Sequence, residues 1–169
     1  MSLDIFIQAR MSSRRLPGKV LKKINNLTIL ELIVKELANL KRIRNIVVLT
    51  SKLKSDDPID KLCKKKKILV YRSNLKNVYK RYVDAINFYN CKSFCRINAD
   101  SPLIDYKLIQ IGINTFLSKK YDIVTNCFLR TFPKGQSFEI IYSNIFLKNF
   151  IKLDKYKYFE HIFLYYYKN

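Results

Sequence analysis

The sequence predicts an α/β domain in which a mostly parallel sheet is covered by helices on both faces. Strand-like and helix-like patterns alternate from residue 4 to residue 125, and short connections join them. This order favours three layers (α/β/α), because consecutive parallel strands need a crossover between them. The 169 residues and the hydrophobic fraction of 49% suit a single domain with a packed core.

The predicted strands are short apolar runs. The first is β-branched and aromatic and stops at a polar, arginine-rich segment. The second, Asn-Ile-Val-Val-Leu-Thr, is typical of a strand that is buried on both faces. In chain order, the predicted strands are residues 4–8, 45–50, 68–71, 93–97 and 122–125.

The predicted helices lie between these strands. Thr28 is followed three residues later by Glu31, which is a capping-box pattern, and apolar residues then recur at helical spacing. Asp57-Pro58 begins a second helix, and residues 74–89 and 105–117 form two more. Ligands bind at the carboxyl ends of parallel strands. We therefore expect the loop after the first strand and the loop that holds Asp100 at the same edge of the sheet.

The net charge of +20 has three explanations. Clustered Lys and Arg bind nucleic-acid backbones, a positive field speeds the approach of small anions, and a lysine-rich composition with solvated side chains needs no partner. The lysines are spread along the chain, with one run at residues 64–67. No helix-turn-helix, RNP-type or zinc-finger pattern accompanies them, so we expect no nucleic-acid partner.

Cysteine spacing and hydropathy set further expectations. The four cysteines have no paired CxxC spacing and His161 is the one histidine, so reduced structural thiols are expected rather than a metal site. No apolar run approaches the roughly 20 residues that cross a bilayer. The amino terminus also lacks the pattern of a secretory signal. We expect a cytoplasmic protein without membrane insertion.

The loop after the first strand carries the strongest chemical signal. Residues 8–21 read Gln-Ala-Arg-Met-Ser-Ser-Arg-Arg-Leu-Pro-Gly-Lys-Val-Leu, a set with four cations, two hydroxyls and a Pro-Gly turn. A triphosphate calls for such groups, because guanidinium forks bind paired oxygens and an ammonium adds a point charge. A solvated basic loop explains the composition equally well, and the Walker pattern is absent.

These fourteen residues closely resemble the QARMSSxRLPGKVL signature of the spore-coat polysaccharide F-type cytidylyltransferases. That family is related to the enzymes that activate sialic acid and Kdo. The resemblance continues at residues 96–105, where the family reads RITADCPLID, and covers nearly the whole chain. Further matching segments are residues 70–73, 78–82, 125–126, 130–135, 139 and 160–161.

The resemblance implies a Rossmann-like fold of the nucleotide-diphospho-sugar transferase type, shortened at the C-terminus. Residues 1–169 are expected to form a single nucleotidyltransferase domain, with residues 126–169 as its acceptor-side and dimerisation region. The implied reaction transfers CMP from CTP to an anionic sugar for surface polysaccharide or glycan biosynthesis, and it releases pyrophosphate. A homodimer is also implied.

The resemblance assigns roles to individual residues. Arg10, Lys19 and Asp100 are the implied catalytic residues, and Asp100 is the implied ligand of a catalytic Mg²⁺. A hard cation prefers carboxylate and phosphate oxygens, which agrees with this role, although a helix N-cap or turn aspartate before Pro102 is the alternative. The implied nucleotide-binding residues are Gln8, Ala9, Arg10, Ser12, Ser13, Arg15, Lys19, Arg72, Ser73 and Asn98.

Four residues are implied on the acceptor side: Arg130, Lys134, Glu139 and His161. Arg130 and Lys134, beside a Pro-Gly bend, suit an acidic sugar, and an ordinary surface turn is the alternative. His161 is placed in an aromatic helix, where a purely structural role competes with acceptor binding.

Two departures from the family pattern leave other functions open. Ser137 stands where the family has an aspartate, and family members continue beyond the position of Asn169. The alternatives are a catalytically impaired nucleotide-binding paralogue or truncated form and, more remotely, a basic nucleic-acid-binding domain. An apolar helical stripe near the end of the chain must pack on the domain, on a second subunit or on a missing segment. Its members are Phe159, Ile162, Phe163, Tyr166 and Tyr167.

Overall fold

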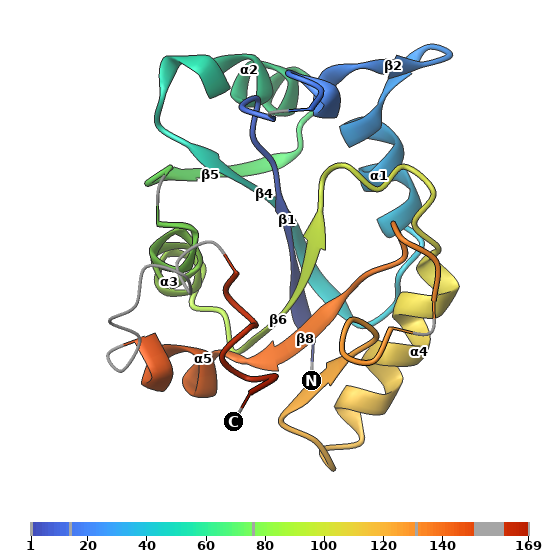
Figure 1. The fold of residues 1–169 in the computed structure, drawn as a ribbon, viewed down its shortest axis with the longest axis vertical. Coiled ribbons are helices and arrows are strands. Elements are labelled where there is room, and N and C mark those ends of the chain that lie inside the picture. Colours follow the sequence, from blue (N-terminus) through green and yellow to red (C-terminus); the bar gives the residue numbers. More distant parts are fainter. Residues whose placement is uncertain (1, 14, 76, 131, 151–160, 169) are drawn as a thin grey trace.

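The computed structural model describes residues 2–13, 15–75, 77–130, 132–150 and 161–168, and these residues form a six-stranded sheet of order β5-β4-β1-β6-β8-β7 (Figure 1). Four neighbouring strands are parallel, as predicted, and their carboxyl ends meet at one edge. They are β1 (Leu3–Gln8), β4 (Ile43–Ser51), β5 (Leu69–Ser73) and β6 (Ser93–Asn98).

The other end of the sheet is antiparallel. The predicted strand at residues 122–125 is confirmed as β7 (Ile123–Thr125), which pairs with β8 (Glu139–Tyr142). Strand β8 escaped the sequence prediction, and it pairs with β6 so that Glu139 lies opposite Arg96. A small hairpin of β2 (Lys23–Ile24) and β3 (Leu27–Thr28) follows the short helix η1 (Lys19–Leu21), and it too was not predicted.

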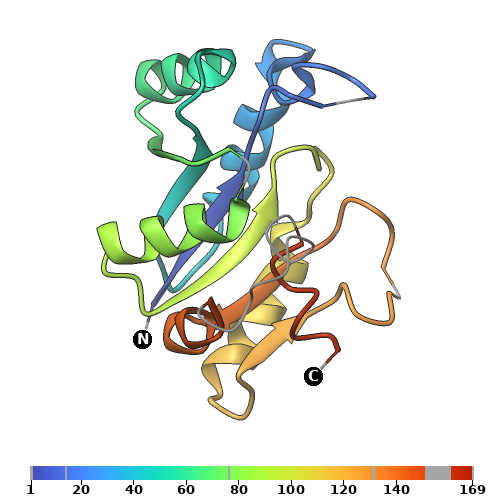
Figure 2. The ribbon, with the colours of Figure 1, turned by 60° about the vertical axis from the view of Figure 1, so that its left-hand side comes forward.

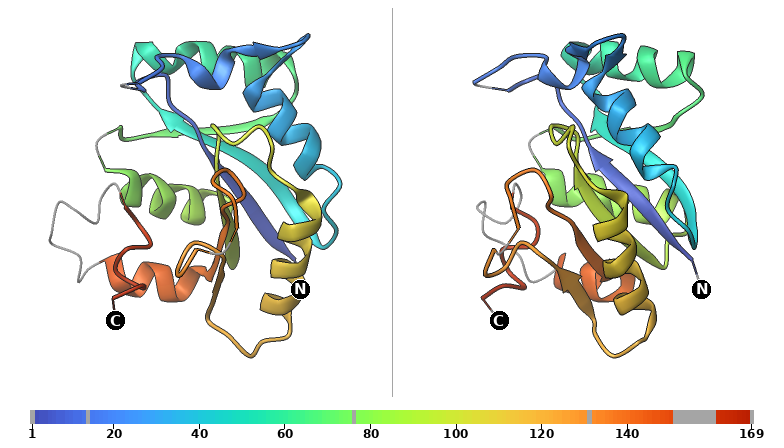
Figure 3. Two further views of the ribbon diagram at one scale, coloured as in Figure 1. Left: turned by 45° about the vertical axis from the view of Figure 1, so that its right-hand side comes forward. Right: turned by 90° about the vertical axis from the view of Figure 1, so that its right-hand side faces the viewer.

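Helices cover both faces of the sheet, and the layers are seen in Figure 2 and Figure 3. One face packs on α1 (Ile29–Leu37), α2 (Asp57–Lys65) and α4 (Tyr106–Leu117). The other face packs on α3 (Val78–Phe88), α5 (Ser143–Phe150) and the segment 161–168. The predicted three-layer fold is therefore confirmed. No helix among the described residues is long and apolar enough to cross a membrane.

Helix α3 begins four residues later than predicted. The Asn77 side chain caps it by accepting from the Lys80 N–H at 2.8 Å. The carbonyls of Asn74 and Leu75 accept instead from the buried guanidinium of Arg81, at 2.9 to 3.1 Å. The side-chain bonds hold residues 74–75 outside the helix, because they satisfy backbone acceptors that helical hydrogen bonds would otherwise satisfy.

The segment 161–168 forms consecutive turns, so the prediction of a helix there was wrong for the described residues. Ile162 and Phe163 are both buried against the sheet. Tyr166 bonds the Tyr79 hydroxyl at 3.0 Å. The aromatic residues therefore pack on this domain. Phe159 lies outside the described residues.

The cysteines are free, and three of them, Cys63, Cys91 and Cys95, are buried. Burial raises the pKa of the Cys63 and Cys91 thiols to about 12. Thiols with such a pKa stay protonated near neutral pH and are poor nucleophiles. Their environment is that of core side chains.

The predicted capping box of α1 is confirmed. Thr28 accepts from the Glu31 N–H at 3.2 Å, and Glu31 accepts from the Thr28 N–H at 2.9 Å. Glu31 also pairs with Lys66 at 2.9 Å, which joins the start of α1 to the end of α2. The Lys66 contact and the Thr28 hydrogen bonds lower the pKa of Glu31 from 4.5 to about 2.

We predict that Glu31→Gln lowers the free energy of unfolding by about 1 kcal/mol at pH 7, because a charged acceptor is lost from the cap. The folded pKa of Glu31 lies below its ordinary value, so its contribution is present above pH 4.5 and is lost as the pH falls toward 2. Urea unfolding of both proteins across this range measures the difference. Asp122→Asn, at an exposed carboxylate, is the matched control. A loss of unfolding free energy in Glu31→Gln that does not change with pH would contradict the lowered pKa of Glu31.

Candidate functional site

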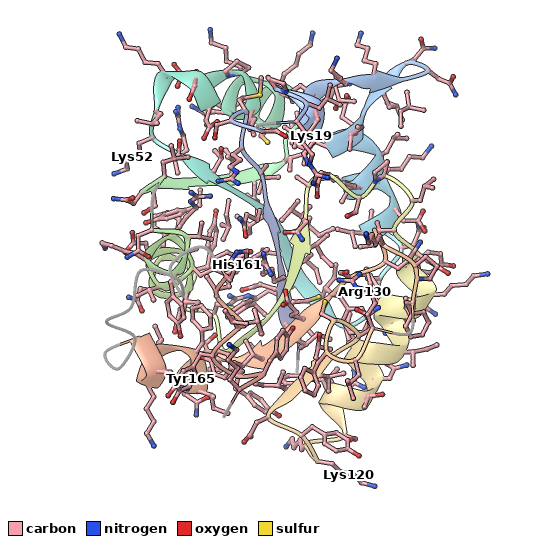
Figure 4. The ribbon with its side chains drawn as sticks, viewed as in Figure 1. Lys19, Lys52, Lys120, Arg130, His161 and Tyr165 are labelled. Carbon is pink, nitrogen blue, oxygen red and sulfur yellow. The ribbon has the colours of Figure 1, made fainter. Side chains whose placement is uncertain are left out.

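The loop that follows β1 is closed by its own backbone. The Met11 carbonyl accepts from the N–H groups of Ser13 and Gly18, both at 2.9 Å. Gly18 has a φ of 68°, and a Cβ there would lie 3.2 Å from the Met11 methyl carbon. Glycine is therefore required where the Pro-Gly turn brings the chain back. The turn places Lys19 at the carboxyl end of the sheet (Figure 4).

A buried carboxylate anchors this loop. Asp56 is fully buried in the short helix η2 (Lys54–Asp56), and one of its oxygens accepts from the Met11 N–H at 2.8 Å. The other oxygen accepts from the Ser51 N–H at 3.2 Å and from the Ser51 hydroxyl at 2.5 Å. Asp56 therefore ties the loop to the end of β4. This role was not predicted, because the one sequence signal of Asp56 is its position directly before the Asp57-Pro58 helix start.

The predicted convergence of the two loops at one edge is confirmed. Gln8 on β1 pairs in register with Asn98 on β6, and a cavity of about 700 Å³ opens beyond them. The Lys19 ammonium contacts the Asp100 carboxylate directly across this cavity. The described residues that line it are Gln8, Arg10, Ser12, Ser13, Arg15, Lys19, Asn98, Ala99 and Asp100.

Three of the predicted nucleotide-binding residues lie outside this lining. Ala9 is buried and donates its N–H to the Leu49 carbonyl at 3.0 Å. Arg72 donates to Asp57 at 2.6 Å and to the Ser51 carbonyl at 2.8 Å, on the β4–β5 side of the sheet. Ser73 donates to Asp84 and lines a separate cavity of about 550 Å³. Their roles in nucleotide binding stay predictions.

Arg130 and Lys134 line a second cavity of about 480 Å³. Asn98 and Asp100 line both this cavity and the first, so the two cavities adjoin at the end of β6. Arg130 donates to the Ser137 hydroxyl at 2.9 Å. The serine that departs from the family pattern therefore contacts one of the predicted acceptor-side cations.

Glu139 and His161 line a third cavity, of about 370 Å³. Glu139 is buried and pairs with Arg96 at 2.5 Å, and the Tyr167 hydroxyl donates to its second oxygen at 2.7 Å. His161 is exposed at the rim. The four predicted acceptor-side residues thus divide between two cavities. Arg96 and Tyr167 were missed by the sequence analysis, because their partners are distant in the chain.

The residues at the junction of the first two cavities fit a magnesium ion. No group of three or more His, Cys, Asp or Glu side chains that could hold a metal ion occurs among the described residues. Magnesium commonly uses one or two carboxylates together with substrate phosphates and water, so a protein cage is not needed. The Asp100 side chain is 39% exposed at this junction, and it offers one such carboxylate beside the cationic loop.

We predict that Asp56→Ala lowers the free energy of unfolding by about 2 to 3 kcal/mol, because it leaves buried N–H donors without an acceptor. It should also release the loop, so that trypsin cleaves faster between residues 10 and 19. Urea unfolding and timed proteolysis measure the two effects. Ser51→Ala removes one hydrogen bond of Asp56 and keeps the bond to Met11, so its loop should resist trypsin as the unsubstituted protein does. Equal cleavage of both variants would contradict the anchoring role.

The sequence model of the cytidylyltransferase family matches residues 5–168. Two curated proteins are similar to this chain. A protein of Methanocaldococcus jannaschii, described as uncharacterised, is 35% identical over 119 residues, which cover 70% of this chain and 49% of that protein. The spore coat polysaccharide biosynthesis protein SpsF of Bacillus subtilis is 29% identical over 164 residues, which cover 94% of this chain and 67% of that protein. The chain spans about half to two thirds of the length of these relatives.

Solved structures agree with this relationship. A cytidylyltransferase from Leptospira borgpetersenii superposes with a TM-score of 0.95 at 35% identity, over 100% of this chain and 72% of that one. A CMP-2-keto-3-deoxy-manno-octonic acid synthetase in complex with CTP superposes with a TM-score of 0.71 at 12% identity, over 92% of this chain and 79% of that one, and shows the Rossmann-like fold alone. The sequence motifs and the match over residues 5–168 lead to one conclusion: this chain belongs to the cytidylyltransferase family.

Proposed function

We propose that this chain transfers CMP from CTP to an anionic sugar and releases pyrophosphate. The observation that carries the proposal is the single cavity in which Arg10, Arg15 and Lys19 face Asp100. Membership of the cytidylyltransferase family supports CTP as the nucleotide. The CTP-bound synthetase of similar fold acts on a sugar acid, which supports an acceptor of that class.

The cationic loop suits a triphosphate. Guanidinium groups bind phosphate oxygens in pairs, and Lys19 adds a point charge at the same cavity. In the proposed reaction an oxygen of the sugar attacks the α-phosphorus of CTP, and the bond from that phosphorus to the bridging oxygen breaks. The electron pair leaves with pyrophosphate, and the proton of an attacking hydroxyl passes to the solvent. Loop cations held in place before the reaction lower the cost of this developing charge.

Asp100 is the residue that would hold magnesium, and a bound ion would supply further neutralisation of phosphate charge. The contact with Asp100 holds the Lys19 ammonium at the junction of the first and second cavities, where an α-phosphate between a nucleotide and an acceptor would lie. Holding a reacting group in place lowers the entropic part of the barrier.

The second cavity is the proposed acceptor site. Arg130 and Lys134 give it a positive lining, which favours a carboxylate-bearing sugar, and it adjoins the nucleotide cavity at Asn98 and Asp100. The exposed Leu103 lines this cavity, and the exposed Phe128 and Leu129 directly precede Arg130. Pairing of two copies through residues 126–169 stays a prediction.

We predict that calorimetric titration shows CTP binding that is stronger with magnesium and stronger than UTP or ATP binding. Arg10→Ala should weaken CTP binding by about 10- to 100-fold, the value of one or two charge-assisted hydrogen bonds. Asp100→Ala should remove the magnesium dependence and stop pyrophosphate release. Lys120→Ala is the matched control, because this exposed lysine lies at the opposite end of the molecule (Figure 4).

The outcomes separate the proposed function from its alternative. A protein that binds CTP but releases no pyrophosphate with any acidic sugar would be the catalytically impaired relative. Arg130 contacts Ser137, where the family has a carboxylate. In the impaired alternative, the defect would therefore lie in acceptor binding rather than in CTP binding. A protein that binds none of the three nucleotides would contradict the proposal itself.

A further inference from the structure

Arg96 connects the nucleotide cavity to the buried Glu139. Its guanidinium lies under the carboxyl ends of β1 and β6 and its side chain is 14% exposed. One nitrogen donates to the Gln8 side-chain oxygen at 3.2 Å, and another donates to the Asn98 side-chain oxygen at 3.3 Å. The third pairs with Glu139 at 2.5 Å. All three guanidinium nitrogens therefore have defined partners.

These contacts fix the orientation of two amides. A guanidinium group has donors and no acceptor, so the amide groups of Gln8 and Asn98 must turn their oxygens toward it. Their NH₂ groups then point away from Arg96. Both residues line the nucleotide cavity, and among the described residues neither NH₂ group has a hydrogen-bond partner. Asn98 also lines the second cavity, so its NH₂ belongs to the junction of the two.

The guanidinium is itself held in place. Glu139 is 8% exposed at its side chain, and its second oxygen accepts from the Tyr167 hydroxyl at 2.7 Å. Burial and the neighbouring Glu139 raise the pKa of Tyr167, so this hydroxyl remains a donor. Burial lowers the pKa of Arg96, but the charge of Glu139, the hydrogen bond to it and the neighbouring Tyr82 and Cys127 together raise it by more, and the guanidinium stays charged. Both oxygens of Glu139 are thus occupied within the domain.

We propose that Arg96 is a positioning residue, which turns the amides of Gln8 and Asn98 so that two N–H donors face the anionic oxygens of a ligand in the nucleotide cavity. Glu139 and Tyr167 hold Arg96 in the orientation that this requires. The identity of the ligand as CTP rests on the proposed function, whereas the amide orientation rests on the contacts of Arg96. Glu139 then acts through Arg96, which differs from the acceptor contact that the resemblance implied.

Isosteric acids test the proposal directly. Gln8→Glu and Asn98→Asp keep an oxygen for Arg96 and gain a charge that Arg96 neutralises, so folding should be preserved. Each acid replaces an N–H donor in the cavity by an acceptor. We expect each variant to weaken CTP binding at least tenfold with no loss of thermal stability, because a charge-assisted hydrogen bond becomes a repulsive contact.

A double-mutant cycle separates positioning from general support of the fold. Arg96→Met with Glu139→Met removes the pair together and leaves no unpaired buried charge, so the protein is expected to fold. This change should weaken CTP binding when both amides are present and have a much smaller effect in a Gln8→Ala, Asn98→Ala background, where neither amide remains to orient. Arg44→Met with Asp4→Met is the control, because it removes an ion pair of 2.5 Å between an exposed guanidinium on β4 and a buried carboxylate on β1, away from the site.

The control pair should alter stability and leave CTP affinity unchanged. Additive losses of affinity in the cycle, or full CTP affinity in both isosteric acids, would overturn the inference while leaving the proposed function intact. If the unsubstituted protein binds no CTP, the proposed function fails, and the same variants titrated with inorganic tripolyphosphate still decide the inference. Tripolyphosphate affinity that is equal in the unsubstituted protein and in both acids, including no binding by any of them, would then overturn it.

Discussion

Parallel pairing of β1 with β6 places Gln8 beside Asn98, and the candidate site depends on that register. The cationic loop and Asp100 must then leave the sheet at the same edge, because both strands run in one direction. The stacked rings of Phe6 and Phe94, with centroids 5.3 Å apart, pack the same face of the two strands deeper in the core. A slip of one residue would turn Arg96 to the opposite face and separate it from Glu139.

Buried carboxylates position much of the positive charge around this edge. Asp56 holds the backbone of the cationic loop, and Glu139 holds Arg96 beneath the two amides. Within the lysine run, Lys64 and Lys66 pair with Asp60 and Glu31. The net charge of +20 therefore does not by itself define the site. A few carboxylates fix the positions of particular cations, including those at the cavity.

Much of the fold followed from local pattern. Neighbouring residues determine the strand runs, the capping box of α1 and the Asp57-Pro58 helix start, and the structure confirms each of them. Strand β8 was missed because its four residues follow a turn and carry no alternation. The start of α3 was misplaced because Arg81, seven residues away in sequence, binds the Asn74 carbonyl.

The site was predictable where a motif carries it and hidden where a distant contact makes it. The motifs at residues 8–21 and 96–105 predicted that the cationic loop and Asp100 lie at the same edge of the sheet, and both line one cavity. The contacts of Asp56 with Met11, and of Arg96 and Tyr167 with Glu139, join residues that are 28 to 45 positions apart, and no spacing rule identifies such pairs. A motif can also predict a site residue that the structure places elsewhere. The motif around Arg72 is intact, but its guanidinium pairs with Asp57 outside the nucleotide cavity.

A crystal structure of the protein grown with CTP and magnesium tests the central claim most directly. The account predicts the triphosphate in the cavity between the β1 loop and the end of β6, in contact with Arg10, Arg15 and Lys19, with Asp100 beside the α-phosphate. A nucleotide seated instead in the cavity lined by Lys52, Ser73 and Lys80 would contradict it.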